Sequence, residues 1–282
     1  MNLVCGDKTL DLSRPHVMGV LNVTPDSFSD GGRYLERHSA VERAGLMVAE
    51  GAAIIDIGGE STRPGATPVP VDEELRRVIP VIEAVRAAYP VVISVDTSRP
   101  RVMTEAVAAG AGMINDVRAL GVAGAAEAAA EAGVPVCLMH MQGEPPTMQD
   151  RPHYDDVVRE VKAALARRVA AAVAAGIARE RLLIDPGFGF GKTLAHNMAL
   201  LRHLEAFQSL GLPLVVGLSR KAIIGKLVGT AVGQRLHGGV ALAVMAVMKG
   251  AAVVRTHDVR ATCEAVTACH RVLHDDLGDA QE

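Results

Sequence analysis

The chain has 282 residues and a formal net charge of -3, and 49% of its residues are hydrophobic, which is ample for the core of a buried parallel sheet. A charge so close to zero gives no overall reason to expect nucleic acid or an anionic membrane as a partner. The longest apolar stretch, 240–248, is too short to span a bilayer, the N-terminus has no secretory pattern, and the four cysteines have neither zinc-site nor disulfide spacing, so we expect a cytoplasmic protein.

Eight short apolar runs, rich in Val, Ile and Leu, stop at polar, charged or glycine residues. In chain order the runs end at Asn22, Asp56, Asp96, Asn115, His140, Asp185, Gly217 and Arg255. The segments between them have apolar residues at helical spacing, such as Leu75, Val78, Ile82 and Val85. This alternation predicts a (β/α)8 barrel; an open doubly wound sheet would also alternate, but it usually has fewer strands. In a barrel the eight endings should converge on one site.

The chain shows no repeat, low-complexity tract or linker that would divide it. A single barrel routinely has about 250 residues, so one domain accounts for the length. We therefore expect one barrel domain over residues 1–273, followed by a polar, solvated tail over residues 274–282.

Two loops are longer and more polar than simple connections require. Residues 24–32 (TPDSFSDGG) follow the first strand, and residues 60–70 (ESTRPGATPVP) follow the second. Either loop by itself could be an ordinary surface turn. Two such loops at neighbouring positions of the same rim favour a lid that closes over a ligand.

Asp96, Asn115 and Asp185 place polar side chains at strand ends, against an apolar barrel interior. A buried carboxylate is costly unless a neighbour or a ligand supplies hydrogen-bond donors. A flat heterocycle with adjacent N–H groups, such as a 2-amino-4-oxo pyrimidine ring, would supply them. Asp96 and Asn115 could instead cap the helices that follow, but three such groups together favour recognition of a ligand.

The segment 187–193 (GFGFGKT) is similar to a phosphate-binding loop but does not match one. Pro186 stands where a Walker loop needs its first Gly, and Lys192 stands where a dinucleotide fingerprint needs its third. We interpret the segment as a turn whose backbone approaches a flat ligand and which presents Phe190 to it. The alternative is a helix-leading turn with Phe190 in the core.

Four cationic residues follow the second, seventh and eighth strands, which are close neighbours around a barrel. They are Arg63, Lys221, Arg255 and His257, and beside them in the sequence are the hydroxyl groups of Ser61, Thr62 and Ser219. Converging cations and hydroxyl groups at one rim predict an anion-binding site.

These motifs resemble those of the dihydropteroate synthases of the folate pathway. The matching segments are MGVLNVTPDSFSDGG, GAAIIDIGGESTRPGA, VDTSRP, IND, MHMQG, DPGFGFGK, GLSRKAIIG and RTHDV, one per strand, within residues 18–259. The resemblance implies that 4-aminobenzoate displaces pyrophosphate from 6-hydroxymethyl-7,8-dihydropterin diphosphate to give 7,8-dihydropteroate. It also implies a homodimer formed through outer helices.

The resemblance further implies a role for each matching residue. The pterin would be bound by Asp96, Asn115, Asp185 and Lys221. The diphosphate would be bound by Asn22, Ser61, Thr62, Arg63, Arg255 and His257, with Mg²⁺ held by Asn22. The aminobenzoate would be bound by Thr62, Arg63, Pro64, Phe190 and Ser219. The expected catalytic residues are Arg63, Lys221, Arg255 and His257.

The chemistry of this reaction needs charge stabilisation more than a strong base, because an arylamine is already a neutral nucleophile at pH 7. With the two loops excluding water, we expect an SN1-like substitution without a covalent enzyme intermediate. A folate-dependent methyltransferase barrel is an alternative, but it needs no cluster of Arg63, Arg255 and His257. A catalytically silent paralogue would have lost motif residues, and this chain retains them.

Overall fold

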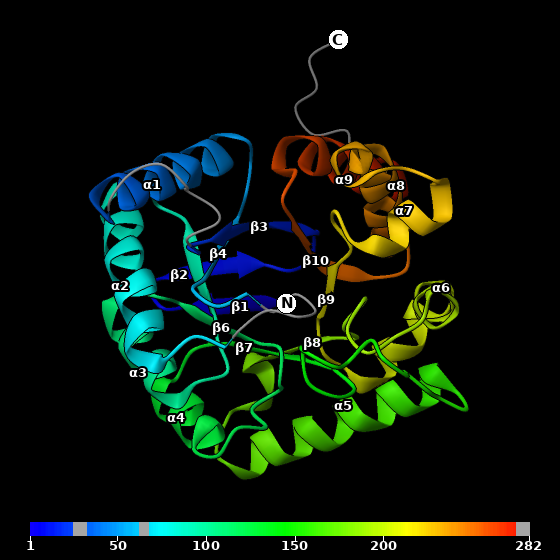
Figure 1. The fold of residues 1–282 in the computed structure, drawn as a ribbon, viewed down its shortest axis with the longest axis horizontal. Helices are drawn as coiled ribbons and strands as arrows, with labels where there is room; N and C mark the ends of the chain where they lie inside the picture. The colour runs from blue at the N-terminus through cyan, green and yellow to red at the C-terminus, as the bar shows by residue number, and fades with distance from the viewer. Residues whose placement is uncertain (25–32, 62–67, 275–282) are drawn as a thin grey trace.

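Eight parallel strands close into a barrel in a computed structural model that describes residues 1–24, 33–61 and 68–274 (Figure 1). The strands are β3 (His16–Asn22), β4 (Ile54–Gly58), β5 (Val92–Asp96), β6 (Met113–Asp116), β7 (Val136–Met139), β8 (Leu182–Asp185), β9 (Leu214–Gly217) and β10 (Ala251–Thr256). The barrel is closed because β10 pairs with both β9 and β3. The predicted (β/α)8 fold is confirmed, since an open doubly wound sheet would leave two unpaired edges.

Helices surround the barrel and connect its strands (Figure 1). They are α1 (Arg33–Ala49), α2 (Val71–Ala88), α3 (Pro100–Ala109), α4 (Ala125–Ala132), α5 (Val157–Ala174), α6 (Leu194–Arg202), α7 (Ala222–Val228), α8 (Leu236–Met248) and α9 (Val259–His274). Helix α2 illustrates the pattern, because Leu75, Val78, Ile82 and Val85 are all buried against the sheet. Apolar residues at this spacing lie on one face of a helix.

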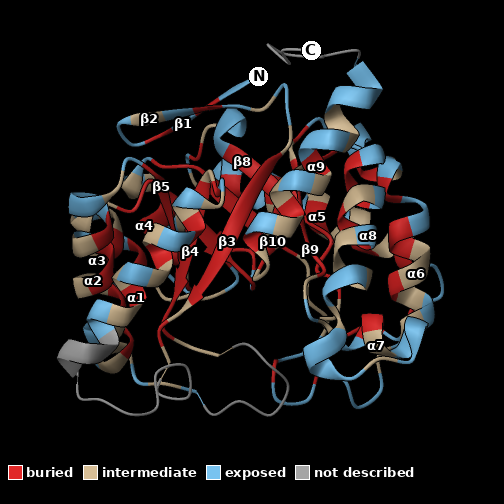
Figure 2. Ribbon diagram, turned by 90° about the horizontal axis from the view of Figure 1, so that it is seen from above, coloured by how far each residue is buried: buried red, intermediate tan, exposed pale blue. Residues whose placement is uncertain are grey.

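An antiparallel hairpin, which we did not predict, precedes the barrel. It consists of β1 (Asn2–Cys5) and β2 (Lys8–Asp11), and it lies across the end of the barrel opposite to the carboxyl ends of the strands (Figure 2). Its buried residues Leu3, Cys5 and Leu10 pack on one side chain from each barrel strand. These side chains are Met18, Ile54, Val92, Met113, Cys137, Leu183, Val215 and Val253. The hairpin therefore closes an apolar floor at the amino-terminal end of the barrel.

Three parts of the chain lie outside the described residues, namely 25–32, 62–67 and 275–282. They include most of the two loops expected to form a lid and most of the predicted tail. Within the part of the chain that the structure does describe, no helix is long and apolar enough to cross a membrane. All four cysteines are free thiols.

Candidate active site

The polar residues of the site occupy the carboxyl-terminal half of the barrel interior, directly above the apolar floor. Successive side chains of a strand point to opposite faces, so the residue two positions beyond each floor residue also points inward. In strand order this second layer consists of Val20, Asp56, Ser94, Asn115, Met139, Asp185, Gly217 and Arg255. Asp96 lies two residues further along β5 than Ser94. The period of the strands thus explains why acidic and amide side chains meet here.

Arg255 is at the centre of the acidic part of the site. Its Nε donates to Asp56 Oδ2 at 2.6 Å, and its Nη2 donates to Asp96 Oδ2 at 2.8 Å. Asn115 Nδ2 also donates to Asp56 Oδ2, at 3.1 Å. We had grouped Arg255 with the cations of the rim, whereas the structure places it between the buried acids.

Burial shifts the pKa values of these groups. It raises the pKa of Asp96 to about 7, although Arg255 acts in the opposite direction. It also raises the pKa of Asp185, against the effect of Lys221 and of the Gly187 N–H group. The same loss of water lowers the pKa of Lys221 to about 8, with Asp185 acting against the shift. The site therefore holds carboxyl groups that can either accept or donate hydrogen bonds near neutral pH.

The turn after β8 joins Asp185, Lys221 and Phe190. Asp185 Oδ1 accepts from the Gly187 N–H group at 2.7 Å, and Lys221 Nζ donates to the Phe188 carbonyl oxygen. Lys221 Nζ also lies 4.7 Å from the centre of the Phe190 ring. Phe190 is half-buried, while Phe188 is fully buried. The core position that we had considered for Phe190 is therefore taken by Phe188.

Lys192 has a structural part in the site that the sequence analysis missed. Its Nζ lies 2.9 Å from the carbonyl oxygens of Gly187 and Phe190, 3.0 Å from His140 Nδ1 and 3.3 Å from the His140 carbonyl oxygen. Burial lowers the pKa of Lys192 to about 7, and burial beside Lys192 lowers the pKa of His140 to about 3. Lys192 thus fixes the turn to the end of β7. The sequence signal was the position of Lys192 directly after the run GFGFG, whose glycines let backbone carbonyl groups turn towards one point.

The rim beside β9 and β10 contains Ser219 and His257. The His257 N–H group donates to Ser219 Oγ at 3.1 Å, and His257 Nδ1 lies 3.2 Å from the same oxygen. Ser219 in turn donates to Asp258 Oδ2 at 3.4 Å, and Arg220 pairs with that carboxylate. The structure therefore brings these two predicted residues together, as expected for neighbouring strands.

The predicted residues of the second loop are only partly described. Ser61 is half-buried just after β4, whereas Thr62, Arg63 and Pro64 lie outside the described residues. The segments that flank this loop are joined by a residue that we did not predict, Arg99. It donates to Glu60 Oε2 at 3.1 Å and also to the Val69 carbonyl oxygen. Arg99 therefore connects the two sides of the loop.

Helix capping does not explain Asp96 or Asn115. The N-cap residue of α3 is Arg99 and that of α4 is Gly124. The turn after β6 is instead stabilised by Asp116, which accepts from the N–H groups of Arg118 and Leu120 at 2.8 and 2.7 Å. The alternative that we had considered for Asp96 and Asn115 is wrong, and their side chains remain directed to the common site.

The fold and this arrangement define a (β/α)8-barrel enzyme with a small-molecule site at the carboxyl ends of its strands. A family model described as "Pterin binding enzyme" matches residues 18–257. The chain is 55% identical to the dihydropteroate synthase of Escherichia coli (strain K12), with 97% of each chain covered. It is 50% identical to that of Haemophilus influenzae, with coverage of 94% and 96%.

Solved structures agree with this relationship. A Xanthomonas albilineans dihydropteroate synthase with 4-aminobenzoic acid has a TM-score of 0.92 and 54% identity over 97% of this chain and 98% of that one. The same enzyme in complex with 7,8-dihydropteroate has a TM-score of 0.89 and 51% identity over 97% and 99%.

The chain belongs to the dihydropteroate synthases, within the pterin-binding enzymes. It is a transferase that condenses 4-aminobenzoate with 6-hydroxymethyl-7,8-dihydropterin diphosphate. The predicted function is confirmed, and neither the methyltransferase barrel nor the silent paralogue is supported.

Proposed function

We propose that this dihydropteroate synthase reacts by ionisation. The bond between the pterin methylene carbon and the bridging oxygen breaks first, and the electron pair leaves with the diphosphate. The nitrogen of 4-aminobenzoate then forms the new bond to the methylene carbon and releases a proton to solvent. No covalent bond to the enzyme forms at any stage.

The observation that carries this proposal is the excess of carboxyl groups over cations around the pterin position. Asp56 and Asp185 are buried there, and the Asp96 side chain is 9% exposed, against the cations Arg255 and Lys221. In their ionised form these carboxyl groups would stabilise a cation formed on the ligand, and that cation would in turn favour the ionised form. The dihydropterin ring would delocalise the positive charge that develops as the diphosphate leaves.

The pterin would be bound by Asp96, Asn115, Asp185 and Lys221. The two carboxyl groups would accept from the N–H groups of the ring, and the amide and ammonium groups would bind its oxygen and nitrogen acceptors. Burial supports these assignments, because Asn115 and Asp185 are 5% and 6% exposed. A ligand that replaces water there must satisfy the carboxylates.

The leaving diphosphate would lie above this layer, towards the rim. Arg255 and His257 would neutralise it together with Ser61, Thr62 and Arg63, and Phe190, Pro64 and Ser219 would enclose the aminobenzoate. Support comes from the contact between Ser219 and His257 and from the position of the Phe190 ring beside Lys221. Thr62, Arg63 and Pro64 are assigned from their sequence motif alone.

Mg²⁺ bound through Asn22 fits the donor groups that the structure describes. Residues 1–24, 33–61 and 68–274 contain no cluster of three His, Cys, Asp or Glu side chains that could hold a metal by themselves. Mg²⁺ commonly keeps several waters and binds through one or two protein oxygens plus substrate phosphates. Asn22 ends β3 at the same rim and offers such an oxygen. When bound, the metal would supply positive charge to the diphosphate.

Positional isotope exchange tests the ionisation step. Dihydropterin diphosphate labelled with ¹⁸O at the bridging position is incubated with enzyme and Mg²⁺ in the absence of 4-aminobenzoate. We expect the label to move into non-bridging positions, because the diphosphate can rotate and recombine. An enzyme that makes dihydropteroate but never moves the label without the arylamine would refute the proposal.

Two substitutions separate the proposed roles of the charged groups. Arg255→Ala should lower kcat more than it weakens pterin affinity, because its charge matters most as the diphosphate departs. Asp185→Asn should mainly weaken binding of a pterin analogue measured by calorimetry. A loss confined to pterin binding in the first variant, or unchanged affinity in the second, would contradict these roles.

We also propose a homodimer formed through outer helices. The surface of α7, α8 and their connection exposes several large apolar side chains: Leu227, Val228, Val232, Leu236, Met245 and Met248. Exposed apolar side chains gathered on neighbouring elements are typical of an interface. Sedimentation of the protein and of Met245→Glu tests it, and a monomeric wild-type protein would contradict it.

The cytoplasmic location remains a proposal as well. It is supported by four free thiols, two of them buried, since such cysteines persist in a reducing compartment. Detection of the protein in the cytoplasmic fraction of lysed cells, and not in the membrane fraction, would check it.

A further inference from the structure

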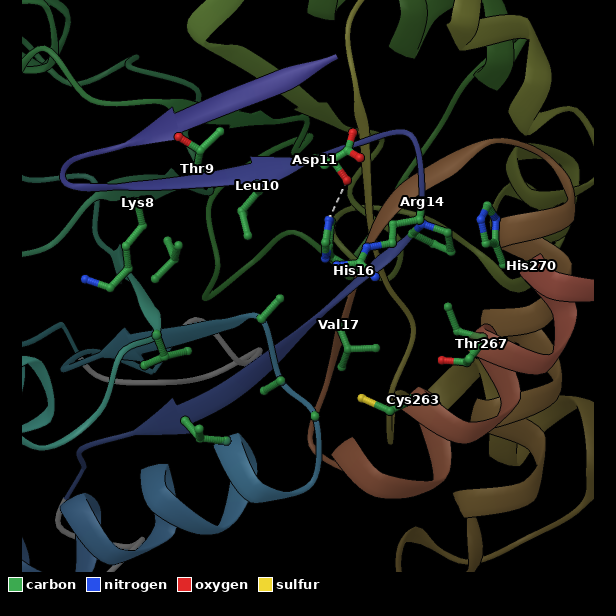
Figure 3. Close-up of a pocket in the computed structure, with 18 of the residues that line it drawn as sticks. Lys8, Thr9, Leu10, Asp11, Arg14, His16, Val17, Cys263, Thr267 and His270 are labelled. Carbon is green, nitrogen blue, oxygen red and sulfur yellow. Dashed lines mark hydrogen bonds between the residues drawn. The ribbon is translucent and has the colours of Figure 1, made fainter. Parts of the chain in front are cut away.

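A second cavity lies at the amino-terminal end of the barrel, opposite to the active site. Its volume is about 730 Å³, within the range of small-molecule sites. It is lined by the hairpin strand β2, the connection from β2 to β3, and the last turns of α9 (Figure 3). None of the residues placed in the active site lines it.

The cavity has an apolar wall. Val17, Val91 and Val92 come from the starts of β3 and β5, while Ala52 and Val266 come from the turn after α1 and from α9. All five side chains are buried. Such a wall suits the face of a flat or aliphatic group, because the group would remove its own apolar surface from water by packing on it.

The opposite part of the lining carries positive charge. Lys8, Arg14 and Arg271 line the cavity, and Asp11 is the acidic residue among them. Lys8 pairs with Asp7 at 2.8 Å, and Asp11 accepts from Ser13. Arg14 interacts electrostatically with Asp11 and His16, but among the described residues neither Arg14 nor Arg271 forms a hydrogen bond or an ion pair. Two guanidinium groups therefore remain available to a ligand.

The arrangement of side chains places the charge beside the wall. Arg14 and His16 lie between the hairpin and the α9 residues Thr267 and His270, whereas Lys8 lies on the far side of the cavity (Figure 3). His16 is buried and its Nε2 lies 2.8 Å from the Asp11 carbonyl oxygen. This contact holds the connection to β3 in place, and with it the backbone that carries Arg14.

We propose that this cavity binds a phosphate monoester with a planar body, of mononucleotide size. The two unpaired guanidinium groups match the charge of a phosphate monoester, which is roughly -1.5 to -2 near pH 7. Guanidinium groups also match the geometry of phosphate oxygens in pairs of hydrogen bonds. The planar part of the ligand packs against the apolar wall.

The dipole of α9 accounts for the position of one of the two arginines but not for that of the other. Arg271 lies in the last turn of α9, where a cation interacts favourably with the helix C-terminus. Arg14 lies on the connection between β2 and β3 and has no helix end to compensate. Its exposed, unpaired guanidinium at the mouth of a cavity is the feature that points to a ligand.

The test measures binding of AMP, adenosine and inorganic phosphate by calorimetry at low salt, and locates it by hydrogen–deuterium exchange. The variants are Arg14→Gln, Arg271→Gln and the double variant, with Arg202→Gln as the control. Arg202 is exposed on α6, so this control removes the same charge outside the cavity. Dihydropteroate synthesis serves as the check on folding, and we expect all four variants to retain it.

We expect AMP to bind and to protect residues 8–16 and 263–271, with affinity about tenfold weaker in the double variant and unchanged in Arg202→Gln. Adenosine and phosphate should each bind more weakly than AMP, because each lacks one half of the contacts. The proposal is overturned if AMP does not bind, if it protects only strand-end segments of the active site, or if the double variant binds it equally well. Equal binding of phosphate or adenosine would also overturn it.

Discussion

Replacement of Arg255 with Met tests whether one guanidinium group neutralises two buried carboxylates. Arg255 contacts Asp56 at 2.6 Å and Asp96 at 2.8 Å, and Asp56 is 0% exposed. Asp56 Oδ1 has no hydrogen-bond partner among the described residues. Removing one member of a buried ion pair costs about 3–5 kcal/mol. Since this change leaves two carboxylates without their cation, we expect a loss in the free energy of unfolding near the upper end, about 5 kcal/mol at pH 8.

The loss should depend on pH in a defined direction. Burial already raises the pKa of Asp96 to about 7, and Arg255 lowers it, so the pKa rises further without Arg255. A carboxyl group with a raised pKa in the folded state holds a proton that the unfolded chain has released. Its contribution to stability therefore falls as pH rises through the folded pKa. The difference between wild type and Arg255→Met should thus be smaller at pH 6 and grow above pH 7.

Urea unfolding at pH 6.0 and 8.5 measures both effects. Arg101→Met is the control, because Arg101 also contacts two acidic residues, Asp72 and Glu105, but its side chain is 59% exposed. The control should lose less than about 1 kcal/mol at either pH. Combining Arg255→Met with Asp96→Asn should cost less than the sum of the single changes. A loss below about 1 kcal/mol in Arg255→Met, or an equal loss in the control, would refute the reasoning.

Three further substitutions, and one control, have expected outcomes in the same unfolding assay. Gly187→Ala should lower the free energy of unfolding by more than about 3 kcal/mol, because the glycine has φ +70° and a Cβ would lie 1.9 Å from the His140 carbonyl oxygen. Gly211→Ala is the control, because this glycine has φ +65° and a Cβ would meet nothing within 4 Å. It should lower the free energy of unfolding by only about 1 kcal/mol. Lys192→Met should cost about 2–4 kcal/mol, since three carbonyl oxygens lose their donor. The loss of stability in Lys192→Met should grow between pH 7 and 10. The pKa of Lys192 is about 7 in the folded state and 10.5 in the unfolded state, so the wild type becomes more stable over this range through a titration that the variant lacks. A loss of stability that is independent of pH would contradict this. Asp156→Ala should cost about 1 kcal/mol, as its side chain caps α5 by accepting from the Arg159 N–H group at 3.0 Å, and no loss would show that solvent replaces the cap.

The sequence predicted the barrel because its information is local and repeated. Eight apolar runs ended at polar, charged or glycine residues, and the structure has a barrel strand at each of them. The hairpin was missed because its strands have only four residues each, and its alternating burial at Leu3 and Cys5 is too short to separate from a loop. The Gly-rich turn was interpreted through Phe190, while Lys192 in the same turn was considered only because it breaks the dinucleotide-binding fingerprint.

By itself, the sequence determined the number and order of strands, the buried faces of the helices, the polar strand ends and the family. These follow from patterns within a few residues of one another and from motifs in a fixed order. Only the tertiary structure decided that Arg255 pairs with Asp56, 199 positions earlier in the chain, and that Lys192 binds carbonyl oxygens. It alone also joined Arg14 and Arg271 in one cavity. The physical reason is closure of the barrel: pairing of β10 with β3 brings distant side chains together, and burial then selects their partners.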